Sequence, residues 1–213
     1  MTTSLMLIFF HLLNQVIDAL GIKGFEALIT GARKRMNHLA YFKVIPPLAM
    51  FKQCKIPSTF YKEAVQAYLL GMSNSSVVMS LKTLELGLKC KTGKRNASLK
   101  VLIDELGERE EYMDLAHGFR ILRNLIVHEE AECSEQDALE ALRHVSEILN
   151  RLFPFEKVHY TITCNNTTCK TRYEVEVKVD EYFLGNIIRT QCPKCKTVNT
   201  IIVGAELGIP QIR

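Results

Sequence analysis

The stretch SEQDALEALRHVSEILNRLFP, residues 134–154, predicts the clearest helix of the chain. Ser134 stands three residues before Asp137, which is a variant of the capping box with Asp in the place of the preferred Glu or Gln. Apolar residues follow at helical spacing, namely Ala138, Leu142, Val145, Leu149 and Leu152. Pro154 ends the pattern because its ring cannot continue a helix. We therefore expect one long amphipathic helix with a buried apolar stripe.

Helical patterns also fill the chain before residue 134. Two of them, Leu5–Leu20 and Phe25–Tyr41, are separated by glycines, and Pro46-Pro47 is expected to end the second. The others are Ser58 to Met72, Ser76 to Cys90, Ser98 to Leu106 and Glu110 to His128. Their short connections favour antiparallel neighbours. The sequence thus predicts a mainly α protein, with an N-terminal helical extension over residues 1–57 and an antiparallel helical bundle over residues 58–154.

After Pro154 the pattern becomes strand-like. β-Branched or alternating residues occupy Tyr160 to Thr163, Tyr173 to Val179 and Thr197 to Val203. Two cysteine pairs accompany these segments, Cys164-x4-Cys169 and Cys192-Pro-Lys-Cys195. Four thiolates give Zn²⁺ a closed tetrahedral site without an open position for water, so such a metal is structural. Residues 155–213 resemble a zinc ribbon, a small β domain whose folding energy comes largely from its metal.

The seven cysteines also indicate the redox state of the chain. A thioredoxin-like redox pair at Cys192 and Cys195 is the competing interpretation, but it lacks a βαβ context and leaves the first pair unexplained. Cys54, Cys90 and Cys133 are scattered singly. An odd, partly clustered set of seven favours metal ligands plus reduced thiols. We therefore expect these three to be buried thiols.

Composition and charge narrow the class of protein. The apolar run from Leu5 to Phe10 is too short to span a bilayer, so we expect a soluble, cytoplasmic protein without a membrane partner. The net charge is only +4, but basic residues cluster in two segments. The strongest candidates for contact with a nucleic acid are Arg33, Lys34, Arg35, Lys94 and Arg95. Such clusters suit a polyanion, although internal charge pairing on a solvated surface explains them equally well.

The segment before His128 carries residues suited to phosphodiester chemistry. At about 100° per residue, a helix places four polar side chains along one stripe. They are His117, Arg120, Asn124 and His128, with Arg123 at the edge of the stripe. The opposite face, with Leu115, Phe119, Leu122 and Ile126, is expected to be core. An arginine fork can bind phosphate oxygens and a histidine can move a proton, which together suffice for RNA cleavage without a metal.

The bundle from Ser58 to Phe153, with Arg123-Asn124 and His128 on its fourth helix, resembles the HEPN superfamily (higher eukaryotes and prokaryotes nucleotide-binding domain). The resemblance implies a metal-independent endoribonuclease of a toxin, defence or RNA-processing system. It also implies a homodimer in which both Arg-x4-His motifs face one cleft, and a protein that neutralises the enzyme as a further partner. Glu85, on the second helix, corresponds to an acidic residue that often lies near the motif in relatives.

These expectations assign a role to each candidate residue. Arg123, Asn124 and His128 would be catalytic, with Glu85, His117 and Arg120 in support. RNA would be the substrate, and Zn would be a structural cofactor, with no catalytic metal. The alternative is a non-catalytic adaptor that binds nucleic acid or protein through the same surface and the zinc ribbon. A purely structural His128, capping the C-terminal end of its helix, also remains open.

Overall fold

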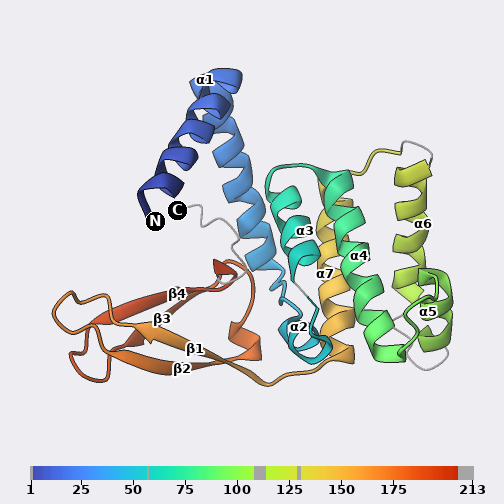
Figure 1. The fold of residues 1–213 in the computed structure, drawn as a ribbon. Helices are drawn as coiled ribbons and strands as arrows, with labels where there is room; N and C mark the ends of the chain where they lie inside the picture. The colour runs from blue at the N-terminus through green and yellow to red at the C-terminus, as the bar shows by residue number, and fades with distance from the viewer. Residues whose placement is uncertain (1, 57, 108–113, 129–130, 206–213) are drawn as a thin grey trace.

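The computed structural model describes residues 2–56, 58–107, 114–128 and 131–205. Within these ranges the chain forms seven α-helices followed by two small antiparallel sheets (Figure 1). The helices are α1 (Thr2–Tyr41), α2 (Leu48–Cys54), α3 (Thr59–Leu69), α4 (Ser73–Thr92), α5 (Leu99–Gly107), α6 (Asp114–His128) and α7 (Glu135–Leu152). The prediction of a mainly helical chain with a small β region near its C-terminal end is confirmed.

The N-terminal helices differ from the prediction in detail. α1 is continuous except for a kink at Gly21, where φ is 69° and ψ is 165°, a conformation that favours glycine. The expected break between two helices therefore exists, but as a kink. Pro46 and Pro47 do not end α1, which stops at Tyr41, and instead precede α2. The short α2 was not predicted, because seven residues are too few to show a helical period.

The predicted capping box begins α7. The hydroxyl of Ser134 accepts a hydrogen bond from the backbone N–H of Asp137 at 3.1 Å, and the Asp137 carboxylate accepts one from the backbone N–H of Ser134 at 2.8 Å. The expected apolar stripe is buried at all five positions, Ala138, Leu142, Val145, Leu149 and Leu152. The local sequence thus fixes both the start and the buried face of this helix.

The core of the bundle lies between α3, α4 and α7 (Figure 1). α4 approaches α7 so closely at Gly87 that a Cβ atom there would clash with Leu149 Cδ2. The same cluster of buried side chains includes Ala32, Met36 and Leu39 of α1. The second half of α1 therefore packs into the bundle core.

The β region consists of two hairpins. β1 (Lys157–Thr163) pairs with β2 (Arg172–Lys178), and β3 (Ile187–Gln191) pairs with β4 (Val198–Ile202). β3 was missed by the sequence patterns. The segment before it is bonded to the connection between α1 and α2, because the backbone N–H of Leu184 donates to the carbonyl of Val44 at 2.9 Å. The sheets lie at the end of the molecule away from α5 and α6 (Figure 1).

A disulfide joins Cys54 of α2 to Cys90 of α4, with the two Cα atoms 5.9 Å apart. The prediction of reduced, buried thiols is wrong for these two residues, and Cys90 is exposed. The packing of α2 beside α4 brings together two cysteines separated by 36 residues, and this proximity has no local signature in the sequence. Cys133 is a free thiol, as expected, but it is half-buried.

Candidate functional site

The four C-terminal cysteines converge on one point between the hairpins. Their sulfur atoms all lie within 4.8 Å of one another. Cys164 Sγ is 3.5 Å from Cys195 Sγ, and Cys169 Sγ is 3.8 Å from Cys192 Sγ. In a tetrahedral site with Zn–S bonds of about 2.3 Å, neighbouring sulfurs lie about 3.8 Å apart. The cluster can therefore bind a metal ion such as zinc.

Two similar turns position these sulfurs. Each turn carries the sequence Cys-Lys-Thr, at residues 169–171 and 195–197, and in each the lysine has a positive φ, 44° at Lys170 and 62° at Lys196. Each turn is closed by a backbone hydrogen bond of 2.9 Å, from Cys164 N–H to the carbonyl of Thr171 and from Cys192 N–H to that of Thr197. The repeated tripeptide is a sequence signal of two matched cysteine turns that the cysteine spacing alone did not reveal.

The two turns also control the charge of the thiols. Hydrogen bonds with the side chain and backbone of Thr197 lower the pKa of Cys195 to about 6, and those with Thr171 lower the pKa of Cys169. Burial raises the pKa of Cys164 to about 11. Because thiolates are the metal-binding form, Cys169 and Cys195 are prepared for a cation, whereas Cys164 must lose its proton to solvent when a cation binds.

Asn199 connects the two turns behind the cysteines. Its side chain is 1 % exposed, and its Oδ1 accepts a hydrogen bond of 2.7 Å from the backbone N–H of Asn165. Its Nδ2 donates to the carbonyl of Thr197 at 3.0 Å and to the hydroxyl of Tyr173 at 2.9 Å. Sequence reasoning missed this residue, because Asn165 and Tyr173 lie far from it along the chain. Asn199 holds the two halves of the cluster in register.

The predicted catalytic residues lie on α6. Arg123 Nη1 donates a hydrogen bond of 3.4 Å to Asn124 Oδ1, and both side chains are half-buried. His128 is exposed at the last residue of the helix. Five residues advance a helix by about 7.5 Å and rotate it by about 140° beyond one turn. One chain therefore brings Arg123 and Asn124 together but leaves His128 on a different side of the helix from Arg123.

The supporting residues of α6 face α5. His117 Nε2 lies 3.2 Å from Asp104 Oδ1. The pKa of Asp104 is lowered, mainly by a hydrogen bond from Lys100 and further by the charges of His117 and Arg120. The Nε of Arg120 is buried and has no hydrogen-bond partner in the described part of the chain. Asp104 thus belongs to this polar cluster, and sequence reasoning missed it because it comes from another helix.

An apolar surface accompanies these polar residues. Ile121 and Val127 are 52 % and 49 % exposed, and Leu125 is half-buried. A Cβ added at Gly118 would find no heavy atom within 4 Å. The expected core face of the helix is confirmed at Phe119, Leu122 and Ile126, whereas the side chain of Leu115 lies outside the described ones. The outward face of α6 therefore presents unburied apolar groups beside His128.

Glu85 pairs with residues of its own helix. Its carboxylate forms ion pairs with Lys82, at 3.3 Å, and with Lys89. Burial opposes ionisation of Glu85, but the hydrogen bonds and charges of the two lysines outweigh burial and lower its pKa. Glu85 is therefore an ionised carboxylate, neutralised by the two lysines of α4.

Two of the five basic residues predicted to contact a nucleic acid form ion pairs within the protein. Arg35 forms an ion pair of 2.9 Å with Glu135 and donates to the carbonyl of Leu69, and Lys94 pairs with Glu105 at 2.8 Å. Arg33, Lys34 and Arg95 are exposed. A further set of exposed cations lies on the β region, at Lys170, Arg172, Arg189, Lys194 and Lys196, and none of them forms an ion pair with a described residue.

Comparisons with known proteins place the chain in a family. In the described ranges, no helix has both the length and the apolar character that crossing a membrane requires. No curated protein and no solved structure matches the chain. A family model, "Domain of unknown function (DUF4145)", matches residues 62–181, which include the α6 motif and the first cysteine pair. Because this match covers more than half of the sequence, the chain belongs to the DUF4145 family.

Proposed function

We propose that this protein is a homodimeric, metal-independent endoribonuclease of the HEPN type. The observation that carries the proposal is the outward face of α6. It carries an exposed His128 and an uncovered apolar surface, and the contacting pair Arg123 and Asn124 lies on the same helix. A guanidinium for phosphate, an amide for orientation and an imidazole for proton transfer are the groups that RNA cleavage needs.

A dimer supports this chemistry because one chain holds only part of the site. Pairing of two α6 helices would bury Ile121 and Val127, which are exposed in one chain, and Leu125, which is half-buried. A two-fold arrangement places the same patch on both partners. The His128 side chain of each copy would then complete a cleft with the Arg123–Asn124 pair of the other.

The proposed reaction follows from these positions. Arg123 binds the scissile phosphate through two parallel hydrogen bonds. One His128 removes the proton of the 2′-hydroxyl, whose oxygen attacks phosphorus. The other His128 protonates the departing 5′-oxygen, which leaves a cyclic 2′,3′-phosphate and a free 5′-hydroxyl. Asn124 orients the 2′-hydroxyl or the imidazole.

The cysteine cluster has a structural role in this proposal. We propose that it binds zinc, because four thiolates with the spacing of a tetrahedron leave no position for a reacting water. The exposed cations of the β region would hold RNA outside the cleavage point, since the sheets lie away from α6 (Figure 1). Binding that uses such contacts weakens steeply with salt.

The test is RNA cleavage by the purified protein, with EDTA added for a short time that leaves a bound structural metal in place. We expect cleavage products with cyclic phosphate ends from the wild type and from His159→Ala, a control on an exposed histidine of β1. His128→Ala should lower the rate at least about a hundredfold, the contribution of one general acid–base group, and Arg123→Ala should lower it by about the same factor through loss of charge stabilisation at the phosphate. Cleavage that survives both substitutions contradicts the proposal.

The dimer has an independent test in light scattering. We expect a mass of two chains at micromolar concentration, and a monomer with unchanged helicity for Ile121→Asp, because the new charge cannot be buried between two helices. A wild-type protein that stays monomeric removes the composite cleft. RNA that is retained but not cleaved by the wild type favours the alternative function, a nucleic-acid-binding adaptor.

A further inference from the structure

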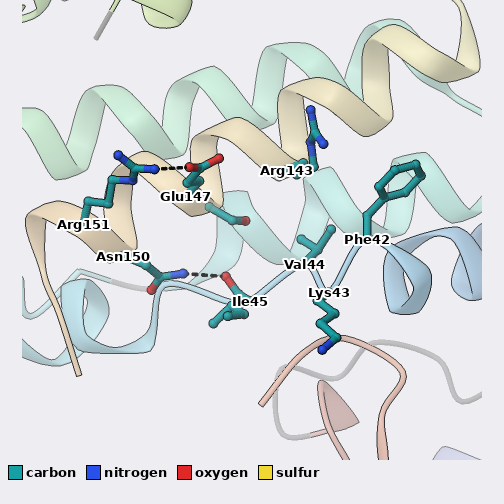
Figure 2. Close-up of a pocket in the computed structure, with 9 residues that line it drawn as sticks. Phe42, Lys43, Val44, Ile45, Arg143, Glu147, Asn150 and Arg151 are labelled. Atoms are coloured by element: carbon teal, nitrogen blue, oxygen red, sulfur yellow. Dashed lines mark hydrogen bonds and ion pairs between the residues drawn. The ribbon is translucent and has the colours of Figure 1, made fainter. Parts of the chain in front are cut away.

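One cavity of the bundle lies between the segment after α1 and α7, and its walls are bonded to each other (Figure 2). Asn150 donates a hydrogen bond of 2.8 Å to the carbonyl of Ile45, which joins the two walls. Arg151 is paired with Glu147 on the α7 side. A second cavity, at the opposite side of α4, differs from it because a covalent bond that a small molecule can exchange is part of its lining.

This second cavity, of about 610 Å³, is lined by α2, α4 and the residues that follow each of them. The disulfide between Cys54 and Cys90 belongs to its lining, together with Gln53, Lys89 and Arg95. The volume falls within the range of small-molecule sites. The cavity therefore gives a molecule from solvent room beside the disulfide, away from the outward face of α6.

The two cysteines of the disulfide differ in exposure. Cys90 is exposed in the last turn of α4, whereas Cys54 is half-buried and packs against the core of the bundle. In thiol–disulfide exchange, a thiolate must reach one of the two sulfur atoms, and the other sulfur leaves. Cys90 is therefore the accessible point of attack, and Cys54 is the leaving group.

The charge around this cavity is positive. Among the described residues, its lining includes two cations, Lys89 and Arg95, and no carboxylate. Lys89 is paired with Glu85 of its own helix, but Arg95 is exposed and forms no ion pair with a described residue. Two further exposed lysines, Lys52 and Lys55, belong to α2 and its C-terminal cap. Such surroundings attract a molecule with negative charge.

We propose that this cavity is a modification site, at which a small anionic thiol forms a mixed disulfide with Cys90. The thiolate sulfur of the small molecule attacks Cys90 Sγ, and the bond to Cys54 Sγ breaks with its electron pair on Cys54. Cys54 takes a proton from water, which balances the proton that the small thiol lost on ionisation. Arg95 pairs with a carboxylate of the bound thiol. One disulfide replaces another, so the step needs no further oxidant.

The modification is reversible because both protein sulfurs stay at the cavity. Cys54 remains packed against the core, and its thiolate can attack Cys90 Sγ and release the small thiol. The covalent link between α2 and α4 is thereby opened and closed by the concentration of small thiols. This response does not depend on RNA cleavage at α6.

The experiment mixes the oxidised full-length protein with reduced glutathione, an anionic tripeptide thiol, without oxygen. The other five cysteines are free thiols, which form no bond with a reduced thiol unless an oxidant is present. Iodoacetamide stops the reaction by alkylating the freed Cys54, and mass spectrometry of the peptides locates the adduct. We expect one glutathione per chain, on Cys90. No adduct, an adduct on Cys54, or a purified protein that stays reduced at both cysteines in air overturns the proposal.

The charge of the site is tested by the rate of the same reaction. Arg95→Gln should slow the reaction with glutathione about two- to fivefold, the value of an exposed ion pair, and should not change the rate with neutral 2-mercaptoethanol. Arg189→Gln, which removes an exposed cation of β3, should match the wild type with both thiols. Equal rates of Arg95→Gln and wild type with glutathione contradict an anion-binding role of Arg95.

Two matched variants, which both lack the disulfide, test the choice of sulfur. In Cys54→Ser, Cys90 should react with oxidised glutathione and keep the adduct, because the thiol that would expel it is absent. In Cys90→Ser, the half-buried Cys54 should react more slowly. Equal rates at the two positions, or a faster reaction at Cys54, contradict the assignment of Cys90.

Discussion

Replacement of Asn199 by Leu should weaken the metal centre although all four cysteines remain. The almost fully buried amide side chain bonds one backbone N–H, one carbonyl and the Tyr173 hydroxyl, and its Nδ2 also lies 4.0 Å from Cys164 Sγ. Leucine has the same branching at Cγ but no polar atoms. The two cysteine turns would therefore lose the bonds that connect them, while all four thiols remain.

The size of the effect follows from the lost bonds. Three neutral hydrogen bonds contribute about 1 kcal/mol each, and part of this loss is recovered when water reaches the exposed Asn165. A net loss of about 2 kcal/mol corresponds to roughly a thirtyfold lower metal affinity. This agrees with the 10- to 100-fold effect of outer residues at other metal sites.

The assay is competition for zinc between the protein and a chromophoric chelator. The chelator concentration that removes half of the zinc should be about thirtyfold lower for Asn199→Leu than for the wild type. Asn96→Leu, the same change at an exposed asparagine, should match the wild type. Equal zinc affinity of wild type and Asn199→Leu would refute the connecting role of this residue. A wild type that binds no zinc would refute the metal centre itself.

Other predictions concern stability and are checked by urea unfolding. Gly87→Ala should destabilise the protein by about 1–3 kcal/mol, because its Cβ meets a buried side chain, whereas Gly118→Ala should stabilise it by about 0.5–1 kcal/mol, since space is open and alanine favours a helix. Equal effects of the two would contradict the close approach of α4 and α7. Cys90→Ser should cost about 4 kcal/mol, the chain entropy of a disulfide loop that spans 36 residues; an unchanged midpoint would mean that Cys54 and Cys90 are reduced. Burial lowers the pKa of His144 in the folded state, so the unfolded chain binds more protons just below pH 6.5 and stability should fall as the pH drops through this window. His144→Gln should reduce this pH dependence. An equal slope of the unfolding free energy against pH in both proteins would contradict the role of His144.

Features with a local signature could be predicted from the sequence. The start of α7 follows from Ser134 and Asp137, and its buried face follows from the apolar period. The strands β1, β2 and β4 and the four clustered cysteines were also found from local patterns. These patterns can be recognised in the sequence because each is determined by residues close together along the chain.

Features that depend on tertiary packing could not be predicted. Cys54 and Cys90 are bonded only because α2 lies beside α4, and Asn199 and Asp104 join their sites from distant segments. β3 begins with two adjacent isoleucines, Ile187 and Ile188, which obscure the alternation of a strand. The role of α6 in RNA cleavage stays a prediction, because its completion depends on a second chain.

The disulfide between Cys54 and Cys90 also changes the covalent topology of the chain. Residues 55–89 form a closed ring that contains all of α3, so a force applied to the two termini cannot extend this segment. At about 3.4 Å per residue, the extended chain in a pulling measurement is roughly 120 Å shorter until the disulfide is reduced. The turn between α3 and α4 exposes Leu70 and Met72 inside this ring. A protease that cuts there leaves two fragments that migrate as one molecule without a reductant and separate after its addition.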